Sequence, residues 1–245
     1  MAPTIVLITG ANRGIGKGLL TTYLARPDHI VIASVRNPAD SSARDLVNFP
    51  TGAGSRLIIV KIDSTVESDA KEAVSQLAAQ GIDHLDIVIA NAGVASIFPS
   101  VEELRIADLK SHIDVNVYGL VYLYQATLPL LRKAAGPKWV TIGSSAGFIV
   151  NPPPIPNAAY APSKIAAHWL TKRINTEEPE LTAWVFHPGW VQTDGGNASA
   201  RFFGLEEAPT PVDESIKGMV KVIDQATKEA TGGNFWNYDG DKLQW

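Results

Sequence analysis

Short apolar segments of strand length recur along the chain. They lie at Thr4–Thr9, Ile30–Val35, Leu57–Ile62, Leu85–Ala90, Trp139–Ile142 and Ala183–Phe186. Most are rich in valine and isoleucine and do not alternate with polar residues, which is typical of strands buried on both faces. The pattern predicts a parallel sheet covered by helices.

Segments with helical spacing separate these strands. They are predicted at Ile15–Leu24, Val66–Ala79, Val101–Ala135 with a break near Leu104–Ala107, Tyr160–Thr176 and Val212–Ala230. Strand and helix alternate from end to end, which is typical of βαβ units. The sequence therefore predicts one α/β domain over residues 1–245, with a doubly wound, Rossmann-like parallel sheet flanked by helices.

Two segments have the composition of loops. Asn151–Asn157 contains four prolines, and Asp194–Pro211 is rich in glycine and proline. Both follow predicted strands, so both are expected at the carboxyl edge of the sheet, where open α/β sheets bind ligands. We predict that residues 194–211 form a mobile lid over the substrate, because Phe202 and Phe203 would otherwise face solvent.

Composition and charge exclude several classes of protein. Hydrophobic residues make up 45% of the chain and charged residues 19%, as in ordinary globular proteins. A formal net charge of −4 argues against nucleic-acid and membrane-surface partners. The chain has no cysteine, so disulfides and thiolate metal sites are excluded, and no metal site is expected. The amino-terminal apolar run ends at Gly10 without a basic flank, so a cytoplasmic protein without signal peptide or membrane span is expected.

A glycine-rich stretch, Thr9-Gly10-Ala11-Asn12-Arg13-Gly14-Ile15-Gly16, follows the first predicted strand and opens a helix. Glycines at such a turn let the backbone approach a pyrophosphate, which the helix amino terminus then favours. The spacing differs from the usual G-x-G-x-x-G, and no Gly-Lys-Ser/Thr follows, so this is not a P-loop. A merely tight turn is the alternative, but the position favours dinucleotide binding.

The end of the second predicted strand favours NADPH over NADH. A site for NAD usually carries an acidic residue about 20 residues beyond the glycines. Arg36 stands there instead, and Arg13 lies within the glycine stretch. Two guanidinium groups suit a 2′-phosphate, which arginine can hold through two hydrogen bonds. An ordinary surface arginine is the alternative for either residue alone.

Three polar signals follow in order: Asn116 in the long helical segment, Ser144 after a strand, and Tyr160 with Lys164 at a helix start. Residues four apart share a helix face. A phenol ionises near about pH 10, and a nearby ammonium lowers that pKa. Tyr160 could then give a proton to a carbonyl oxygen while a hydride arrives from the cofactor. A core tyrosine with a surface lysine is the alternative for this pair alone.

Together these motifs resemble the short-chain dehydrogenase/reductase family over essentially the whole chain. The resemblance implies NADPH-dependent reduction of a small-molecule ketone to a secondary alcohol, with Asn116, Ser144, Tyr160 and Lys164 as catalytic residues. Ser144 would hydrogen-bond the carbonyl oxygen, and Lys164 would lower the pKa of Tyr160 and hold the nicotinamide ribose. Asn116 would support a water that relays protons. A single chain, a homodimer and a homotetramer all stay open as assemblies.

The family's cofactor motifs match this chain one by one. Asp63 matches an acidic residue that holds the adenine in the family. Asn91-Ala92-Gly93 matches the family's Asn-Asn-Ala-Gly element, except that Ala90 stands in place of the first asparagine. The residues implied to contact NADPH are Gly10, Asn12, Arg13, Gly14, Ile15, Gly16, Arg36, Asp63, Ser64, Asn91, Ala92, Gly93, Tyr160, Lys164, Pro188, Gly189, Val191 and Thr193.

Two segments, His187–Asp194 and Asp239–Trp245, resemble a narrower group that includes fungal norsolorinic-acid-type ketoreductases and sniffer-like carbonyl reductases. This resemblance implies aromatic or polyketide ketones as substrates. The residues predicted at the substrate are Ser145, Ala146, Phe148, Trp190, Phe202 and Phe203. Tyr160 follows Ser144 by sixteen residues, more than is usual in the family, so Ser145 stays open as the catalytic hydroxyl.

Two other functions stay open: a cofactor-binding regulator without turnover, and a non-redox relative such as a lyase or dehalogenase. The complete set of Asn116, Ser144, Tyr160 and Lys164 argues against the first, and the intact glycine stretch argues against the second. The sequence also suggests packing or interface roles for His168 and a structural role at a strand end for His187.

Overall fold

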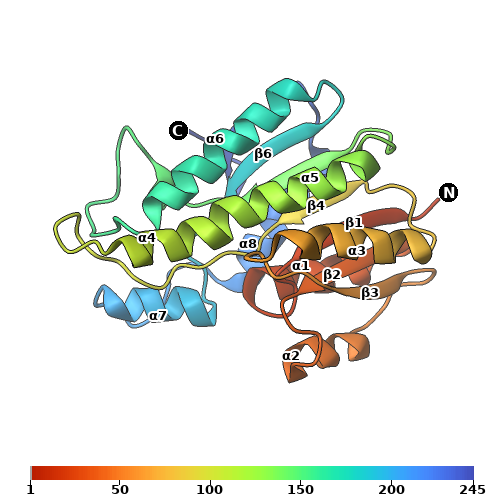
Figure 1. Ribbon diagram of the computed structural model, residues 1–245, viewed down its shortest axis with the longest axis horizontal. Coiled ribbons are helices and arrows are strands. Elements are labelled where there is room, and N and C mark those ends of the chain that lie inside the picture. Colours follow the sequence, from red (N-terminus) through yellow and green to blue (C-terminus); the bar gives the residue numbers. More distant parts are fainter. Residues whose placement is uncertain (1) are drawn as a thin grey trace. The chain divides into compact units, whose positions relative to one another are not determined.

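The structure, a computed structural model, describes residues 2–245 (Figure 1). Eight strands form one sheet in the order β3-β2-β1-β4-β5-β6-β7-β8. Their bounds are β1 Thr4–Thr9, β2 His29–Val35, β3 Arg56–Lys61, β4 Ile87–Ala90, β5 Lys138–Ile142, β6 Thr182–His187, β7 Phe235–Asn237 and β8 Lys242–Leu243. The pairs β1–β2, β2–β3, β1–β4 and β6–β7 are parallel, and β8 runs antiparallel to β7. The predicted doubly wound, mostly parallel sheet is confirmed.

The helices lie mostly where the hydrophobic spacing predicted them, with shifts at their ends, but Ser41–Arg44 and Asp194–Phe202 were not predicted as helices. They are α1 Gly14–Leu24, α2 Ser41–Arg44, α3 Glu67–Ala79, α4 Ile106–Ile113, α5 Gly119–Leu131, α6 Ala161–Glu177, α7 Asp194–Phe202 and α8 Val212–Gln225. A π-helical turn, Asp114–Tyr118, separates α4 from α5, and a 3₁₀ turn, Ser145–Gly147, follows β5. The helix predicted from Val212 ends at Gln225 because Ala226 has an extended backbone.

The chain falls into two compact units. Unit 1 comprises the residues up to Ala92 together with Tyr118–Val140, and unit 2 comprises Gly93–Val117 together with Thr141–Trp245. That the chain is a single domain stays a prediction.

Unit 1 is built around the buried centre of β1 and β2. Val6, Leu7, Val31 and Ile32 have no solvent exposure. Burying one such side chain contributes about 1.5–3 kcal/mol, so these uninterrupted apolar strands account for much of the unit's stability. Helix α3 lies alongside α5 in this unit (Figure 1).

Unit 2 is built around β6, which packs against α6 and pairs with β7. Its largest fully buried side chains are Trp184, Phe186 and Phe235. β7 and β8 were not predicted, because runs of three and two residues are too short to show a strand pattern.

The interpretation of residues 194–211 as a loop is wrong for their first half, which forms α7. Glycines normally disfavour a helix, but here the Thr193 hydroxyl accepts the Gly196 N–H at 3.0 Å and caps the helix. Gly196 also lies so close to the Val191 carbonyl oxygen that a side chain would overlap it. The close approach explains a glycine at a helical position.

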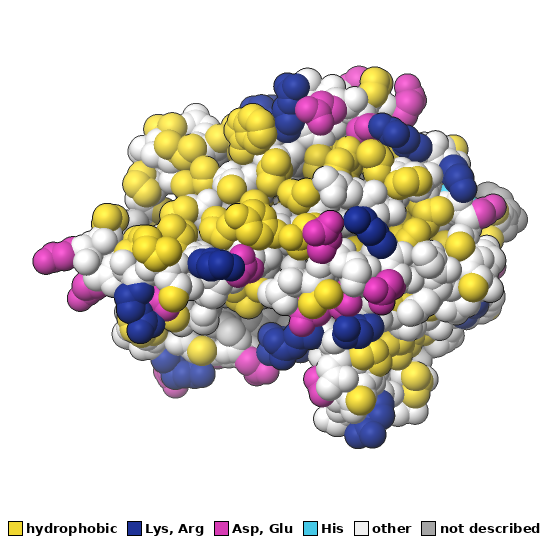
Figure 2. Space-filling model, viewed as in Figure 1, with side chains coloured by type: hydrophobic (Ala, Val, Ile, Leu, Met, Phe, Trp, Pro, Cys, Tyr) yellow, Lys and Arg dark blue, Asp and Glu magenta, His cyan; other side chains and the backbone are white. Residues whose placement is uncertain are grey.

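The face drawn in Figure 2 shows basic and acidic side chains interspersed over the region of α3 in unit 1, not segregated by sign. Helix α3 itself carries Glu67, Asp69, Lys71 and Glu72 within two turns. Within residues 2–245, no helix has the length and apolar character needed to span a membrane.

Candidate functional site

The glycine turn of unit 1 connects β1 to α1, beside the point where the strand order reverses between β1 and β4. Gly10 and Gly14 have positive φ angles of 63° and 52°, which only glycine adopts without strain. The Thr9 hydroxyl accepts the backbone N–H groups of Asn91 and Ala92 at 3.0 and 2.9 Å. The Asn91 amide donates to the carbonyl of Thr9 at 2.7 Å. These bonds fix the turn against the end of β4.

Gly16 lets α1 start directly on this turn. A Cβ at Gly16 would overlap the Gly10 carbonyl oxygen and lie 2.6 Å from the Asn91 amide nitrogen. In the described chain no side chain caps the amino end of α1, and its first turn holds no acidic residue. Free N–H groups and the positive end of the helix dipole therefore suit a phosphate group.

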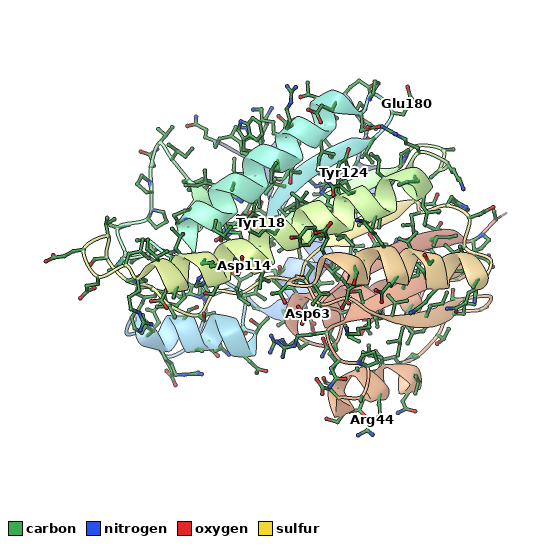
Figure 3. All side chains as sticks on the ribbon, viewed as in Figure 1. Arg44, Asp63, Asp114, Tyr118, Tyr124 and Glu180 are labelled. Atoms are coloured by element: carbon green, nitrogen blue, oxygen red, sulfur yellow. The ribbon has the colours of Figure 1, made fainter. Side chains whose placement is uncertain are left out.

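Two arginines are exposed here: Arg13 lies within this turn, and Arg36 directly follows β2. The Asn12 amide donates to the Ser42 hydroxyl at 2.8 Å and so ties the turn to α2, a contact that the sequence did not predict. Arg44, also on α2, lies at the outer end of the helix and away from Asp63 (Figure 3).

Asp63 and Ser64 form a turn after β3. The Asp63 carboxylate accepts from the Thr65 N–H and hydroxyl at 2.9 and 2.7 Å. Burial raises the pKa of Asp63, but the Thr65 hydrogen bonds and the positive charge of Arg36 outweigh it, so the pKa lies below its ordinary value. Ser64 packs so closely on Gly119 at the start of α5 that a Cβ on that glycine would overlap it.

Tyr160, Lys164 and Ser144 come together in unit 2. Tyr160 is the residue before α6, and Lys164 lies one turn later. The Lys164 Nζ lies 5.7 Å from the centroid of the Tyr160 ring and donates to the Ile142 carbonyl at the end of β5 at 2.8 Å. The Tyr160 hydroxyl shares a hydrogen bond with Ser144. The partner of the Tyr160 hydroxyl is thus Ser144, the first of the two adjacent serines.

The electrostatics of this group differ from the sequence-based expectation. Burial raises the pKa of Tyr160 to about 12, against the opposing effect of its hydrogen bond with Ser144. Burial lowers the pKa of Lys164 to about 8. In the protein alone, desolvation of the phenolate therefore outweighs its hydrogen bond with Ser144. The raised pKa keeps Tyr160 protonated at neutral pH.

Asn116 lies in the π-helical turn and is buried. Its amide nitrogen donates to the Val94 carbonyl and to the Ser163 hydroxyl, both at 2.9 Å, and its amide oxygen accepts the Val94 N–H at 2.9 Å. Both amide hydrogens are thus used within the protein. Asn116 links the segment after β4 to the first turn of α6, three residues from Tyr160. Single π turns are frequent at functional sites.

The residues after β6 form a tight turn. The Pro188 carbonyl accepts from the Ser215 hydroxyl at 2.6 Å, and Gly189 has a φ of 83°. Val191 is buried and forms a parallel bridge with Thr210, and Thr193 caps α7. Of the remaining positions implied for the cofactor, Ile15 is partly buried and Gly93 is exposed.

An aromatic group in unit 2 contains three of the predicted substrate residues. Phe203 lies 5.0 Å from Phe202 and 6.1 Å from Trp190, measured between ring centroids. Phe98, which the sequence reasoning missed, lies 5.6 Å from Phe202 and 5.3 Å from Phe203. Phe148 contacts a different residue, Phe235 of β7, at 5.6 Å. A lone phenylalanine in a segment without periodicity gives no signal, which is why Phe98 was missed.

The proline-rich segment lines a pocket together with Ala146. The other lining residues are Pro152, Pro153, Ile155, Asn157 and Ala161. The pocket thus joins the 3₁₀ turn after Ser144 to the start of α6 after Tyr160. Ser145, next to Ala146, is partly buried.

Two histidines close to Ser144 give a testable pH dependence of stability. Burial, with smaller effects of Lys164 and His187, lowers the pKa of His168 to about 3, and burial lowers that of His187 to about 4 against the opposing charge of Asp239. As pH falls below the ordinary histidine pKa near about 6.5, the unfolded chain binds protons that the folded chain cannot. The stability these neutral rings confer is complete above that pH. It is lost below it at about 1.4 kcal/mol per pH unit for each histidine.

Urea unfolding between pH 7.5 and 5 measures how the free energy of unfolding changes with pH. We expect His168→Gln to reduce this slope by the contribution of one histidine, about 1.4 kcal/mol per pH unit. An identical slope in the variant and the wild type would contradict the neutral state of His168.

A doubly wound sheet with a glycine turn after β1 defines a Rossmann-like α/β protein. The sequence pattern of the short chain dehydrogenase family matches residues 4–201. The norsolorinic acid ketoreductase of Dothistroma septosporum is 43% identical over 249 residues, covering 99% of this chain and 92% of that protein. The short-chain dehydrogenase srdF of Neurospora crassa is 41% identical, covering 99% and 98%.

Solved structures agree with this assignment. The NADPH-bound carbonyl reductase from chicken fatty liver matches with a TM-score of 0.87 at 29% identity, covering 100% of this chain and 95% of that one. The carbonyl reductase Sniffer of D. melanogaster matches with a TM-score of 0.85 at 26% identity, covering 100% of both chains. The chain belongs to the short-chain dehydrogenase/reductase family of oxidoreductases. Among the described residues, no group of three His, Asp or Glu side chains is placed to hold a metal ion.

Proposed function

We propose that this protein is an NADPH-dependent ketoreductase that reduces a ketone to a secondary alcohol. The observation that carries the proposal is the hydrogen-bonded pair of Tyr160 and Ser144, with Lys164 one helical turn away. A regulator without turnover would not need the buried Lys164 one helical turn from the Tyr160 phenol. The ketoreductase and carbonyl reductase names of the relatives support the same reaction.

The glycine turn fits the cofactor. Gly10 and Gly14 adopt left-handed backbone angles that favour glycine, and a side chain at Gly16 would overlap the turn where α1 approaches it closely. We assign the pyrophosphate to this turn, the adenine to Asp63 and Ser64, and the 2′-phosphate to Arg13 and Arg36. An intact glycine turn also argues against a non-redox relative that binds no cofactor.

In the proposed reaction NADPH, when bound, supplies a hydride to the carbonyl carbon. Tyr160 donates its hydroxyl proton to the carbonyl oxygen, so the C=O double bond becomes an alcohol C–O–H. Ser144 hydrogen-bonds the same oxygen and stabilises the negative charge that develops there. The pKa of Lys164 is about 8, which is close enough to neutral pH for its ammonium group to return a proton toward Tyr160. Asn116 positions the first turn of α6 through Ser163.

The aromatic group of Phe98, Trp190, Phe202 and Phe203 supports an aromatic ketone as substrate. Aromatic rings prefer offset or edge-on contacts at the centroid distances found among these four side chains. Phe202 is 65% exposed, which leaves apolar surface that a ring of the substrate could cover. The norsolorinic acid ketoreductase names of relatives point to the same substrate class.

A substrate screen tests the proposal directly. Aryl ketones, α-diketones and polyketide quinones are each mixed with NADPH or NADH, and cofactor oxidation is followed by absorbance. We expect turnover with NADPH and at least one aryl or polyketide ketone. Tight NADPH binding without oxidation across the whole panel would overturn the proposal in favour of a regulator.

We also propose that residues 194–211, including α7, act as a lid. Within α7 only Ala200 is buried, and segments with few buried side chains open readily. The Trp190 indole donates to the Gly196 carbonyl and the Ser199 hydroxyl at 3.0 and 2.9 Å, so it holds α7 to the segment before it, where we place the hinge of the lid. We expect hydrogen exchange of α7 amides to be faster than that of β6 amides and to slow when NADPH is added. Exchange as slow as in β6, and unchanged by NADPH, would contradict the lid.

A further inference from the structure

The backbone that carries Ser144 leaves the sheet immediately before that residue. β5 ends at Ile142, and the Gly143 N–H still bonds the Phe186 carbonyl of β6 at 2.7 Å. The next two N–H groups, of Ser144 and Ser145, have passed the end of the strand and need other acceptors.

Two imidazole rings supply those acceptors. The Ser144 N–H donates to Nε2 of His168 at 3.2 Å, and the Ser145 N–H donates to Nδ1 of His187 at 3.3 Å. The three following N–H groups are bonded within the turn: Ala146 to the Ser144 hydroxyl at 3.1 Å, and Gly147 and Phe148 to backbone carbonyls at 3.0 Å. The histidines are thus the only side chains from outside the turn that bond its backbone N–H groups within the described residues.

The His168 ring is enclosed by the turn it holds. A Cβ at Gly143 would overlap His168 Nε2, and a Cβ at Gly147 would lie 2.6 Å from its Cε1. On another side the ring packs on Phe235 at 4.7 Å between centroids, and Phe235 stacks with Trp245 at 5.5 Å. The glycine three residues after Ser144 therefore makes room for the imidazole.

His168 also shares a helix face with the reacting pair. Tyr160, Lys164 and His168 follow one another at four-residue intervals along the start of α6. The face that presents the phenol and the ammonium thus presents a third side chain, which holds the backbone of their partner Ser144. A shift of the serine relative to this face would change the Tyr160–Ser144 contact on which the proposed proton transfer depends.

We propose that His168 and His187 are positioning residues that hold the Ser144 hydroxyl for catalysis by accepting the N–H groups of Ser144 and Ser145. The assignment rests on the proposed function of Ser144. It goes beyond the packing or interface role predicted for His168 and the structural strand-end role predicted for His187, because an apolar side chain of similar size would fill the space and leave an N–H without an acceptor.

Each ring uses a different nitrogen, so each has a different matched replacement. Glutamine places an acceptor near the position of Nε2, and asparagine places one near Nδ1. At position 168 we expect His168→Gln to stay close to the wild-type kcat, while His168→Asn and His168→Leu lower kcat about 10–100-fold with little change in the NADPH dissociation constant. At position 187 the order is reversed: His187→Asn retains activity and His187→Gln loses it.

Thr171→Val is the matched control. Thr171 is a buried residue of α6 whose hydroxyl bonds Thr141 of β5 at 2.7 Å, so its loss weakens the same helix–strand packing without touching the serine turn. We expect this control to lower stability and leave kcat unchanged. Equal losses of kcat in the glutamine and leucine variants of His168, or a comparable loss in Thr171→Val, would overturn the positioning role.

Imidazole NMR separates failure of this inference from failure of the proposed function. Long-range ¹H–¹⁵N spectra at pH 7.5, assigned with His168→Gln and His187→Asn, should show His168 neutral with its proton on Nδ1 and His187 neutral with its proton on Nε2. The opposite tautomers, or charged rings, would overturn the inference even if the enzyme reduces ketones. If no ketone in the screen is reduced, the proposed function fails while the tautomers still decide whether the histidines hold the turn.

Discussion

Replacing Tyr160 with phenylalanine is expected to lower kcat for ketone reduction by about 10²–10⁴-fold, the usual contribution of a general acid. Only the hydroxyl is lost, and the ring keeps its place at the start of α6, in edge-on contact with His112 at 6.1 Å. NADPH binding should change little, because the glycine turn, Arg13 and Arg36 are untouched. Single-turnover kinetics, with the NADPH dissociation constant measured by fluorescence, separate the two effects.

Tyr118→Phe is a suitable control for this prediction. Tyr118 lies at the end of the π-helical turn and is 49% exposed, and the same hydroxyl is removed there without effect on Tyr160 or Ser144. We expect wild-type kcat in this variant. If Tyr160→Phe retained more than about a tenth of the wild-type kcat, a value well above what loss of a general acid allows, another group would have to donate the proton.

The fold could be predicted because its buried strands and amphipathic helices have lengths that hydrophobic spacing detects. β1 was predicted with both ends correct, and α3 to within one residue. The elements that were missed are held by contacts outside the segment itself. α7 forms because Thr193 caps it and because Gly196 can approach the Val191 carbonyl, and neither effect leaves a periodic pattern.

The candidate site was predictable where its chemistry needs fixed spacing along the chain. Tyr160 and Lys164 share a helix face by their separation alone, and the glycine turn is local in sequence. Contacts between distant segments were not predictable in this way. His168 bonds Ser144 across 24 residues and Phe98 meets Phe202 across more than 100. Nor could the sequence show that burial dominates the pKa of Tyr160, because desolvation depends on packing from several elements.

Cofactor preference gives the second large effect, and the prediction concerns Arg36. This exposed residue follows β2, at the position where an NAD enzyme carries a carboxylate, and its charge already helps to lower the pKa of Asp63. A charge-assisted hydrogen bond to a 2′-phosphate contributes about 1.5–3 kcal/mol, which corresponds to about 10- to 100-fold in kcat/KM. We therefore expect the wild type to prefer NADPH over NADH at least about tenfold.

Most of this preference should lie in KM, because contacts remote from the reacting carbon bind the ground and transition states equally. Arg36→Ala should remove most of the preference, and Arg36→Asp should reverse it, since a carboxylate repels the phosphate and accepts hydrogen bonds from a free 2′-hydroxyl. Arg44→Ala is the matched control, because that arginine is exposed on α2 and lies away from Asp63 (Figure 3). Steady-state kinetics with both cofactors decide the outcome. An unchanged NADPH-to-NADH ratio in Arg36→Ala, or an equal loss in Arg44→Ala, would make Arg36 a surface charge without a role in cofactor choice.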